Sequence, residues 1–188
     1  MYWWTNYHIK KTFQTAGAIA LAVVLLSACS QQQHNASETA YEIDLPSYFK
    51  GEIESLTKQN PKITKTVFKD IVKETKSLHI NDWERELGSF LAVDINKPAY
   101  KGLYTKDSTD NLVRYQFTKS DISQISIEYQ EGVPAVIQIE KSVKNLLYNS
   151  TEKITYASNQ FYTIDKEQEV KVLGTNKYKI EGILGDKK

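Results

Sequence analysis

The spacing of apolar residues changes along the chain, from a helical period in its first half to a strand-like period in its second half. Phe49, Ile53 and Leu56 recur at i, i+4 and i+7, which predicts one apolar face of a helix over residues 46–59. Asp44 lies where an N-cap residue is expected, and the proline that follows suits a first helical turn. We therefore expect a helix that packs on a sheet.

Residues 62–78 have two interpretations. Many of them are β-branched and fall in two runs separated by a polar pair, which favours a β-hairpin. Ile63, Val67 and Ile71 would also make a helical stripe. We take the hairpin as the prediction and keep the helix as its alternative.

Residues 82–94 return to a helical spacing. Asn81 followed by Glu84 has the spacing of a capping box, and the apolar residues beyond it predict one buried face. Trp83 stands at the start of this segment. A core position explains it better than a role as a platform for a ligand, because large aromatic residues dominate protein cores.

From residue 99 onward apolar and polar residues alternate, and short polar turns separate the runs. We expect residues 143–149, which are unusually apolar, to turn a corner between two strands. The spacing indicates an antiparallel meander whose apolar face needs a cover. The predicted fold is therefore α+β, with two N-terminal helices packed on a long antiparallel β-meander, either a curved sheet or a half-barrel. The candidate strands are residues 99–106, 111–118, 122–130, 134–142, 151–158, 160–166, 169–174 and 177–183.

Near the start of the chain, two lysines precede an apolar run from Ala16 to Leu26, which ends in the motif Leu26-Ser27-Ala28-Cys29. A charged start, a short apolar stretch and a small-residue site are typical of a secretory signal. A membrane-spanning helix needs about 20 apolar residues, so this run is too short to favour one.

The four-residue motif resembles the bacterial lipobox at every position. The resemblance implies a diacylglyceryl group on the Cys29 thiol, cleavage before Cys29, and further acylation of the new amino group, for example with palmitate. It divides the chain into a signal peptide over residues 1–28, an acylated cysteine with a polar tether over residues 29–40, and one domain over residues 41–188. Two or three acyl chains give stable anchoring to a membrane. Ser30 follows the cysteine, which in enteric-type lipoproteins implies the outer membrane.

Composition excludes several classes of function for the processed chain. Removing residues 1–28 takes away two lysines, so 22 basic and 23 acidic residues remain, and this balance gives no electrostatic footprint for nucleic acid. Acylation of Cys29 would leave no free thiol. Only His34 and His79 remain as imidazole ligands or bases. We therefore expect no metal, no cofactor and no histidine-based catalytic triad, and we regard enzymatic activity as doubtful.

Carboxylates and tyrosines are the remaining candidates for chemistry. A glycosidase needs two carboxyl groups that face each other across a cleft, whereas most of these carboxylates stand at expected caps and turns. The tyrosines would offer stacking surfaces for sugars or, more simply, pack as strand residues. The candidate carboxylates are Asp82, Glu84, Glu86, Asp94, Asp107, Asp110 and Asp121. The tyrosines in or beside the predicted strands are Tyr100, Tyr104, Tyr115, Tyr129, Tyr148, Tyr156, Tyr162 and Tyr178.

Two further resemblances concern the Bacteroidota. Asp107-Ser108-Thr109 resembles a short acceptor for O-glycosylation in that phylum. The stretches Asp44–Phe49 and Asp94–Pro98, followed by the meander, resemble small uncharacterised outer-membrane lipoproteins. The resulting prediction is a membrane-anchored periplasmic lipoprotein with a non-enzymatic binding or envelope-assembly role. Its partners would be the membrane, through the lipid, and an envelope protein or hydrophobic ligand. The alternatives are a carrier or chaperone for an amphiphile and a carboxylate-dependent hydrolase.

Overall fold

The computed structural model describes residues 42–185, and its first element is helix α2 (Leu45–Gln59), where the apolar spacing predicts a helix. Asp44 is the N-cap residue, and its carboxylate accepts a hydrogen bond of 2.9 Å from the Ser47 backbone N–H. Asn60 ends the helix in the left-handed conformation, at a φ of 42°. The signal, the lipobox and the tether predicted over residues 1–40 lie outside the described residues.

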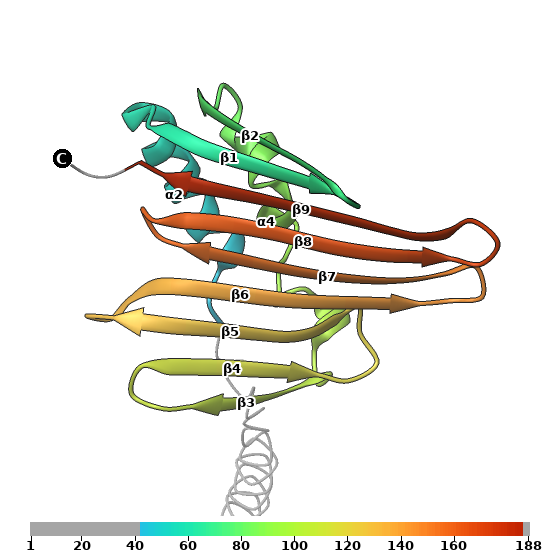
Figure 1. Ribbon diagram of the computed structural model, residues 1–188. Coiled ribbons are helices and arrows are strands. Elements are labelled where there is room, and N and C mark those ends of the chain that lie inside the picture. Colours follow the sequence, from blue (N-terminus) through green and yellow to red (C-terminus); the bar gives the residue numbers. More distant parts are fainter. Residues whose placement is uncertain (1–41, 186–188) are drawn as a thin grey trace, which may run out of the picture. The chain divides into compact units, whose positions relative to one another are not determined.

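A nine-stranded sheet forms the rest of the fold, and its strands run in the order β2-β1-β9-β8-β7-β6-β5-β4-β3. Every neighbouring pair is antiparallel. The sheet is open, with β2 and β3 at its two edges, and does not close into a barrel (Figure 1). The strands are β1 (Lys62–Lys69), β2 (Val72–His79), β3 (Tyr104–Ser108), β4 (Leu112–Phe117), β5 (Ile122–Gln130), β6 (Val133–Lys144), β7 (Tyr148–Ala157), β8 (Phe161–Val170) and β9 (Gly174–Leu184).

The hairpin predicted over residues 62–78 is confirmed as β1 and β2. Its place in the sheet is unexpected, because β1 pairs with β9, the last strand of the chain. Ile63 lies opposite Leu184, and Lys69 lies opposite Tyr178. The first hairpin therefore extends the meander at its C-terminal strand.

Two segments differ from the predicted meander at its start and its end. The predicted strand over 99–106 begins instead as a short 3-10 helix, η1 (Pro98–Tyr100), because proline fixes a helical φ at that position. The turn expected between the predicted strands 169–174 and 177–183 is wrong. Gly174 already pairs with Val170, so a three-residue loop over 171–173 joins β8 and β9. Strand β8 combines most of the predicted strand 160–166 with the start of 169–174, and β9 contains the whole predicted strand 177–183.

The corner predicted at residues 143–149 is a tight hairpin. Strand β6 continues to Lys144, which pairs with Asn149 at the start of β7. Only residues 145–147 remain outside the strands. The apolar residues of this segment consequently stand at the end of a hairpin.

The helix predicted over residues 82–94 is two short helices, α3 (Trp83–Glu86) and α4 (Gly88–Leu91). Leu87 separates them with a φ of −98° and a ψ of 15°, next to a glycine that weakens helix formation. The cap also differs from the prediction, since Asp82 rather than Asn81 accepts the N-terminal hydrogen bond, 2.9 Å from the Arg85 N–H.

The helices cover one face of the sheet, and the core lies between the two layers (Figure 1). Phe49 of α2, Phe90 of α4 and Tyr156 of β7 pack against one another with ring centroids 5.0–6.0 Å apart. Trp83 of α3 packs edge-on against Tyr162 of β8. Trp83 is 2% exposed, in agreement with its expected place in the core.

Burial ends partway along the four longest strands. Ile139, Ile154 and Ile164 are buried, whereas residues further toward the β6–β7 and β8–β9 turns are half-buried or exposed. Figure 1 shows β6, β7, β8 and β9 continuing well past α2 and α4 toward these turns. The end of the sheet is therefore a projecting arm without helical cover.

Candidate functional site

Three hairpins at the same end of the sheet carry pairs of exposed aliphatic residues. The pairs stand in or beside the β1–β2, β6–β7 and β8–β9 turns, and their side chains are 65–103% exposed. Apolar side chains at single surface positions are normal, but a repeated pair at neighbouring turns is not. The pairs are Ile71 and Val72, Leu146 and Leu147, and Val172 and Leu173.

The β6–β7 and β8–β9 turns lie directly beside each other. The Lys171 backbone N–H donates a hydrogen bond of 3.1 Å to the Leu147 carbonyl oxygen, which ties the two loops together. Tyr148 pairs with Val170, so the two turns reach the same level of the arm. We call Leu146, Leu147, Val172 and Leu173 the aliphatic tips.

The third pair stands further back. Lys69, the last residue of β1, pairs with Tyr178 of β9. Tyr178 comes four residues after Gly174, where β9 begins beside the tips. At about 3.3 Å per residue, the β1–β2 turn lies roughly 13 Å behind the aliphatic tips. Ile71 and Val72 therefore extend the exposed apolar end of the sheet but do not share its outermost position.

Both loops at the tips have a defined backbone conformation. The Asn145 side-chain oxygen accepts hydrogen bonds from the backbone N–H groups of Leu147, at 2.8 Å, and Tyr148, at 2.9 Å. In the other loop, the Leu173 N–H donates to the Val170 carbonyl oxygen at 3.1 Å. Val172 has a φ of 85°, which is a strained value for a β-branched residue.

Lysines stand at the base of each exposed pair. Lys144 and Lys171 open the two tip loops, and both side chains are exposed. Over residues 142–150 and 167–177 there are three lysines and two carboxylates, and one of these carboxylates, Glu167, forms an ion pair with Lys177. Within the described part of the chain, neither Lys144 nor Lys171 forms an ion pair. The end of the arm therefore combines aliphatic side chains with free positive charge.

An open groove of about 340 Å³ crosses strands β5–β8 behind the tips, and its lining is mostly polar. Three of its four carboxylates form ion pairs: Glu140 with Lys153 at 3.1 Å, Glu152 with Lys141 at 3.3 Å, and Glu167 with Lys177 at 3.3 Å. Asp165 is the fourth carboxylate. These lysines occupy the carboxylates that a pair of carboxyl groups facing each other across the groove would need.

On the covered face, a glutamate from each of three segments meets a buried tyrosine of the sheet. The Tyr156 hydroxyl donates to Glu52 of α2 at 2.5 Å, and the Tyr162 hydroxyl donates to Glu86 of α3 at 2.6 Å. Lys65 of β1 forms an ion pair of 2.7 Å with the same Glu86. These contacts join the helical layer to the sheet.

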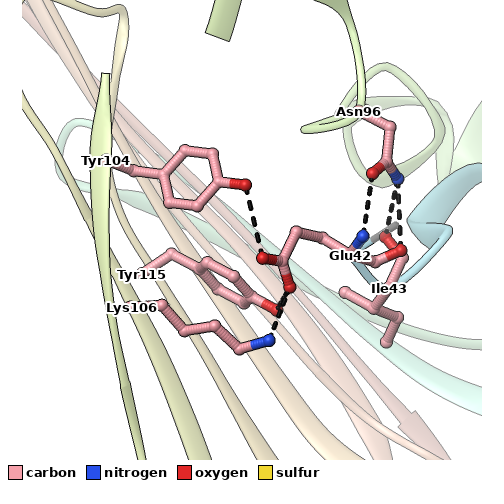
Figure 2. A network of polar contacts seen from close by, with 6 residues as sticks. All are labelled: Glu42, Ile43, Asn96, Tyr104, Lys106 and Tyr115. Carbon is pink, nitrogen blue, oxygen red and sulfur yellow. Dashed lines mark hydrogen bonds and ion pairs between the residues drawn. The ribbon is translucent and has the colours of Figure 1, made fainter. Parts of the chain in front are cut away.

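The third contact lies where the chain enters the domain (Figure 2). The Glu42 carboxylate accepts hydrogen bonds from Tyr115 at 2.8 Å and Tyr104 at 3.4 Å, and pairs with Lys106 at 2.6 Å. The Asn96 side chain also bonds the Glu42 backbone, accepting from its N–H at 3.0 Å and donating to its carbonyl at 3.3 Å. Asn96 thus holds the segment that leads into α2.

These contacts shift pKa values in directions that follow from their chemistry. Burial raises the pKa of Glu42, but the hydrogen bonds from Lys106 and Tyr115 and the Lys106 charge outweigh it, so the net pKa is lowered. Burial, and then the hydrogen bond to Glu52, raise the pKa of Tyr156 far above its ordinary value. Burial and the Glu52 charge raise the pKa of Tyr48 to about 12. The lowered pKa keeps the Glu42 carboxyl group ionised, and the raised pKa values keep the tyrosine hydroxyls protonated. These are the forms that make the hydrogen bonds described above.

Most of the carboxylates selected from the sequence have structural partners or lie on the surface. Asp82 caps α3, Asp94 accepts from the Asn96 N–H at 3.0 Å, and Asp121 accepts from the Tyr100 hydroxyl at 3.1 Å. Glu86 is occupied by Tyr162 and Lys65. The remaining members, Glu84, Asp107 and Asp110, are exposed.

The other residues selected from the sequence are buried in the core, lie at the surface or fall outside the described residues. Tyr115, Tyr156 and Tyr162 are buried, as packed strand residues are expected to be. His79 contacts the Asn60 carbonyl oxygen at 2.9 Å, and Asp107-Ser108-Thr109 lies exposed at the end of edge strand β3. Cys29 lies outside the described residues. Within residues 42–185, no cluster of His, Cys, Asp or Glu side chains has the composition of a metal site.

Sequence reasoning missed the aliphatic tips, although it noted the apolar stretch at 143–149. The available signal was an aliphatic pair that begins one or two positions after a lysine, which occurs at both tip loops. No helix in the described part combines the length and hydropathy needed to cross a membrane. No protein-family model, curated protein or solved structure matches the chain.

Proposed function

We propose that the protein is a lipid-anchored lipoprotein of the bacterial cell envelope whose domain has a non-enzymatic binding or assembly role. The observation that carries the proposal is the motif Leu26-Ser27-Ala28-Cys29 at the end of a short apolar run. Ser30 favours the outer membrane, with the domain on the periplasmic side. The domain supports a binding role, because the glutamates of its covered face are held by tyrosine and lysine side chains rather than paired across a cleft.

The two alternative functions receive less support. A carrier for an amphiphile needs an apolar cavity of several hundred Å³, but Phe49, Phe90 and Tyr156 fill the space between α2, α4 and the sheet. A carboxylate-dependent hydrolase needs two carboxyl groups that face each other across a cleft. The groove over β5–β8 instead holds three carboxylates in ion pairs.

Replacing Cys29 tests the anchor. The full chain and its Cys29→Ser variant are produced in a bacterial host fed an alkyne analogue of palmitate, and Ser30→Ala is the matched control outside the motif. We expect label and a processed mass for the parent chain and for Ser30→Ala, and neither of the two for Cys29→Ser, whose yield in the membrane fraction should fall. Equal processing and membrane yield for Cys29→Ser would refute the lipid anchor.

Purification of the acylated protein from crosslinked membranes tests the binding role. Mass spectrometry that finds envelope proteins crosslinked to the domain would support it. Lipid that stays bound to the domain after the acyl anchor has been removed would replace it with the carrier alternative. A chain that hydrolyses a panel of glycoside and ester substrates would replace it with the hydrolase alternative.

A further inference from the structure

We propose that the aliphatic tips are a second membrane contact, which inserts into the interfacial region of a bilayer that carries anionic phospholipid. This inference uses the proposed anchor only to bring the domain to a membrane. It concerns a separate surface, on the folded domain itself. The tips are Leu146 and Leu147 of one hairpin and Val172 and Leu173 of the next.

The first argument is the amount of apolar surface at one place. All four side chains are at least 72% exposed, and a hydrogen bond holds their two loops side by side. Burying aliphatic side chains in the interface between headgroups and acyl chains is favourable, and short apolar elements typically reach about 5–10 Å into it. The protruding turns of two hairpins suit that depth.

The second argument is charge complementarity. Lys144 and Lys171 stand at the bases of the two loops, where their ammonium groups would meet phosphates while the aliphatic side chains enter the apolar layer. Lys177, further along the same arm, is paired with Glu167 and does not add to this charge. Lys69 and Lys73 flank the third exposed pair, further back. A membrane surface matches this combination of protruding aliphatic residues and surrounding lysines.

The third argument is that the loops hold the aliphatic residues outward. Asn145 fixes its loop through two hydrogen bonds to the backbone. Val172 occupies a left-handed position, with a φ of 85°, where glycine or asparagine fits with less strain. A valine placed there is poorly explained by the stability of the turn. An apolar contact outside the chain explains it better.

The length of the tether permits such a contact. Twelve residues, 30–41, separate Cys29 from Glu42. A chain of that length extends to at most about 40 Å. Tyr115, which Glu42 contacts, lies level with Ile154 through the register of β4–β7, so Leu147 is about 23 Å along the strands and about 14 Å across them from it. A tether of this reach therefore allows the acylated end and the tips to meet one bilayer.

A fluorescent probe tests the contact in the acylated full-length protein. Leu147→Cys supplies a labelling site, because Cys29 is the only native cysteine and acylation would block it. Gln160→Cys, in the exposed β7–β8 turn and without a positive φ, is the matched control. Each protein carries an environment-sensitive dye and is reconstituted into vesicles of phosphatidylcholine and phosphatidylglycerol in equal parts. We expect the dye at 147, and not at 160, to shift its emission to the blue and to be quenched by nitroxide-labelled acyl chains.

The same experiment separates the possible outcomes. Equal, water-like emission at both positions would overturn the proposal. A blue shift at 147 without lipid quenching, growing with protein concentration, would assign the tips to a second copy of the chain and also overturn it. Dye on the parent chain, which has no introduced cysteine, would show an unacylated Cys29 and so a failure of the lipid anchor rather than of the tips.

A charge variant tests the complementarity. In the Leu147→Cys background, we expect Lys144→Glu with Lys171→Glu to lower the ratio of inserted to free tips by about tenfold or more. On vesicles of phosphatidylcholine alone, the ratio of inserted to free tips should fall for the protein that keeps both lysines. The proteins with and without the two lysines should then differ little. An unchanged ratio on anionic vesicles would overturn the role of the lysines. Unchanged circular dichroism of the variant establishes that the fold is intact.

Discussion

At the scale of single residues, a buried tyrosine must keep a hydrogen-bond partner when its hydroxyl leaves water. Tyr115, Tyr156 and Tyr162 meet this requirement with carboxylates, which accept stronger hydrogen bonds than neutral oxygens. Such hydrogen bonds to charged groups contribute about 1.5–3 kcal/mol each. The ring packs in the core while the hydroxyl fixes the segment above it. Each tyrosine therefore serves both the packing of the core and the orientation of the segment that covers it.

Gly182 gives the Tyr162 ring room over strand β9. The two residues are directly paired across β8 and β9, and a methyl group at position 182 would overlap the ring. We predict that Gly182→Ala lowers the free energy of unfolding by about 1–3 kcal/mol, because the ring must move away from Glu86 or the strands must separate. Urea denaturation followed by circular dichroism measures this change.

Gly51→Ala is the control for that substitution. Gly51 lies on α2 with nothing near the position of the added methyl group. Alanine is the better helix former by about 1 kcal/mol, so this variant should be more stable than the parent. Equal stabilities of the parent and Gly182→Ala would contradict the close packing of glycine and tyrosine.

At the scale of elements, the β8–β9 turn has a valine, Val172, at a position whose backbone conformation suits glycine or asparagine better. The φ of 85° at Val172 strains a β-branched side chain, whereas asparagine tolerates the left-handed region well. We predict that Val172→Asn raises the free energy of unfolding by about 1 kcal/mol. The same variant should weaken insertion of the tips, so that stability and membrane contact change in opposite directions.

Leu173→Asn separates these two effects. It removes a neighbouring exposed aliphatic side chain at a residue without a positive φ. Its stability should stay within about 0.5 kcal/mol of the parent, as is usual for surface substitutions, while insertion weakens. Denaturation curves and the vesicle assay read the two quantities separately. A Val172→Asn variant less stable than the parent would contradict the inference that valine is strained at the φ of residue 172.

The elements that the sequence predicts well are those whose signal is local. The stripe of α2, its Asp44 cap and the strand predicted over residues 122–130 all depend on neighbours in the chain, and all are confirmed. Errors occur where local composition gives the wrong signal. Gly174-Thr175-Asn176 has the composition of a turn but starts a strand, because the turn before it is built from aliphatic residues.

At the scale of the whole molecule, pairings between distant segments were not predictable from the pattern. Strand β1 joins β9 across more than a hundred residues, and Glu42 bonds Tyr115 over a separation of 73 positions. Alternation identifies which residues of a strand are buried but does not identify the neighbouring strand. The aliphatic tips share this limit, since only the antiparallel register shows that residues 147 and 171 are adjacent.

The raised pKa values of the buried tyrosines make the folded molecule less stable in alkaline solution. Burial and neighbouring glutamates raise the pKa of Tyr48 to about 12 from its ordinary value of 10.0, and raise those of Tyr115, Tyr156 and Tyr162 further. A pKa that is higher in the folded state means that the unfolded chain loses protons first as pH rises. The stabilisation is complete below the ordinary tyrosine pKa and is lost as the pH rises through and above it.

We therefore predict that the free energy of unfolding falls steadily above about pH 10, where unfolded tyrosines ionise. Denaturation curves at a series of pH values measure the slope, and tyrosinate absorbance should show a late group of residues that ionise only as the protein unfolds. Tyr156→Phe should reduce that slope, because one of the residues with a raised pKa is gone, and should be less stable at neutral pH because Glu52 loses a donor. If all tyrosines ionised together near the ordinary pKa while the fold persisted, the carboxylate–tyrosine contacts could not be what joins the helices to the sheet.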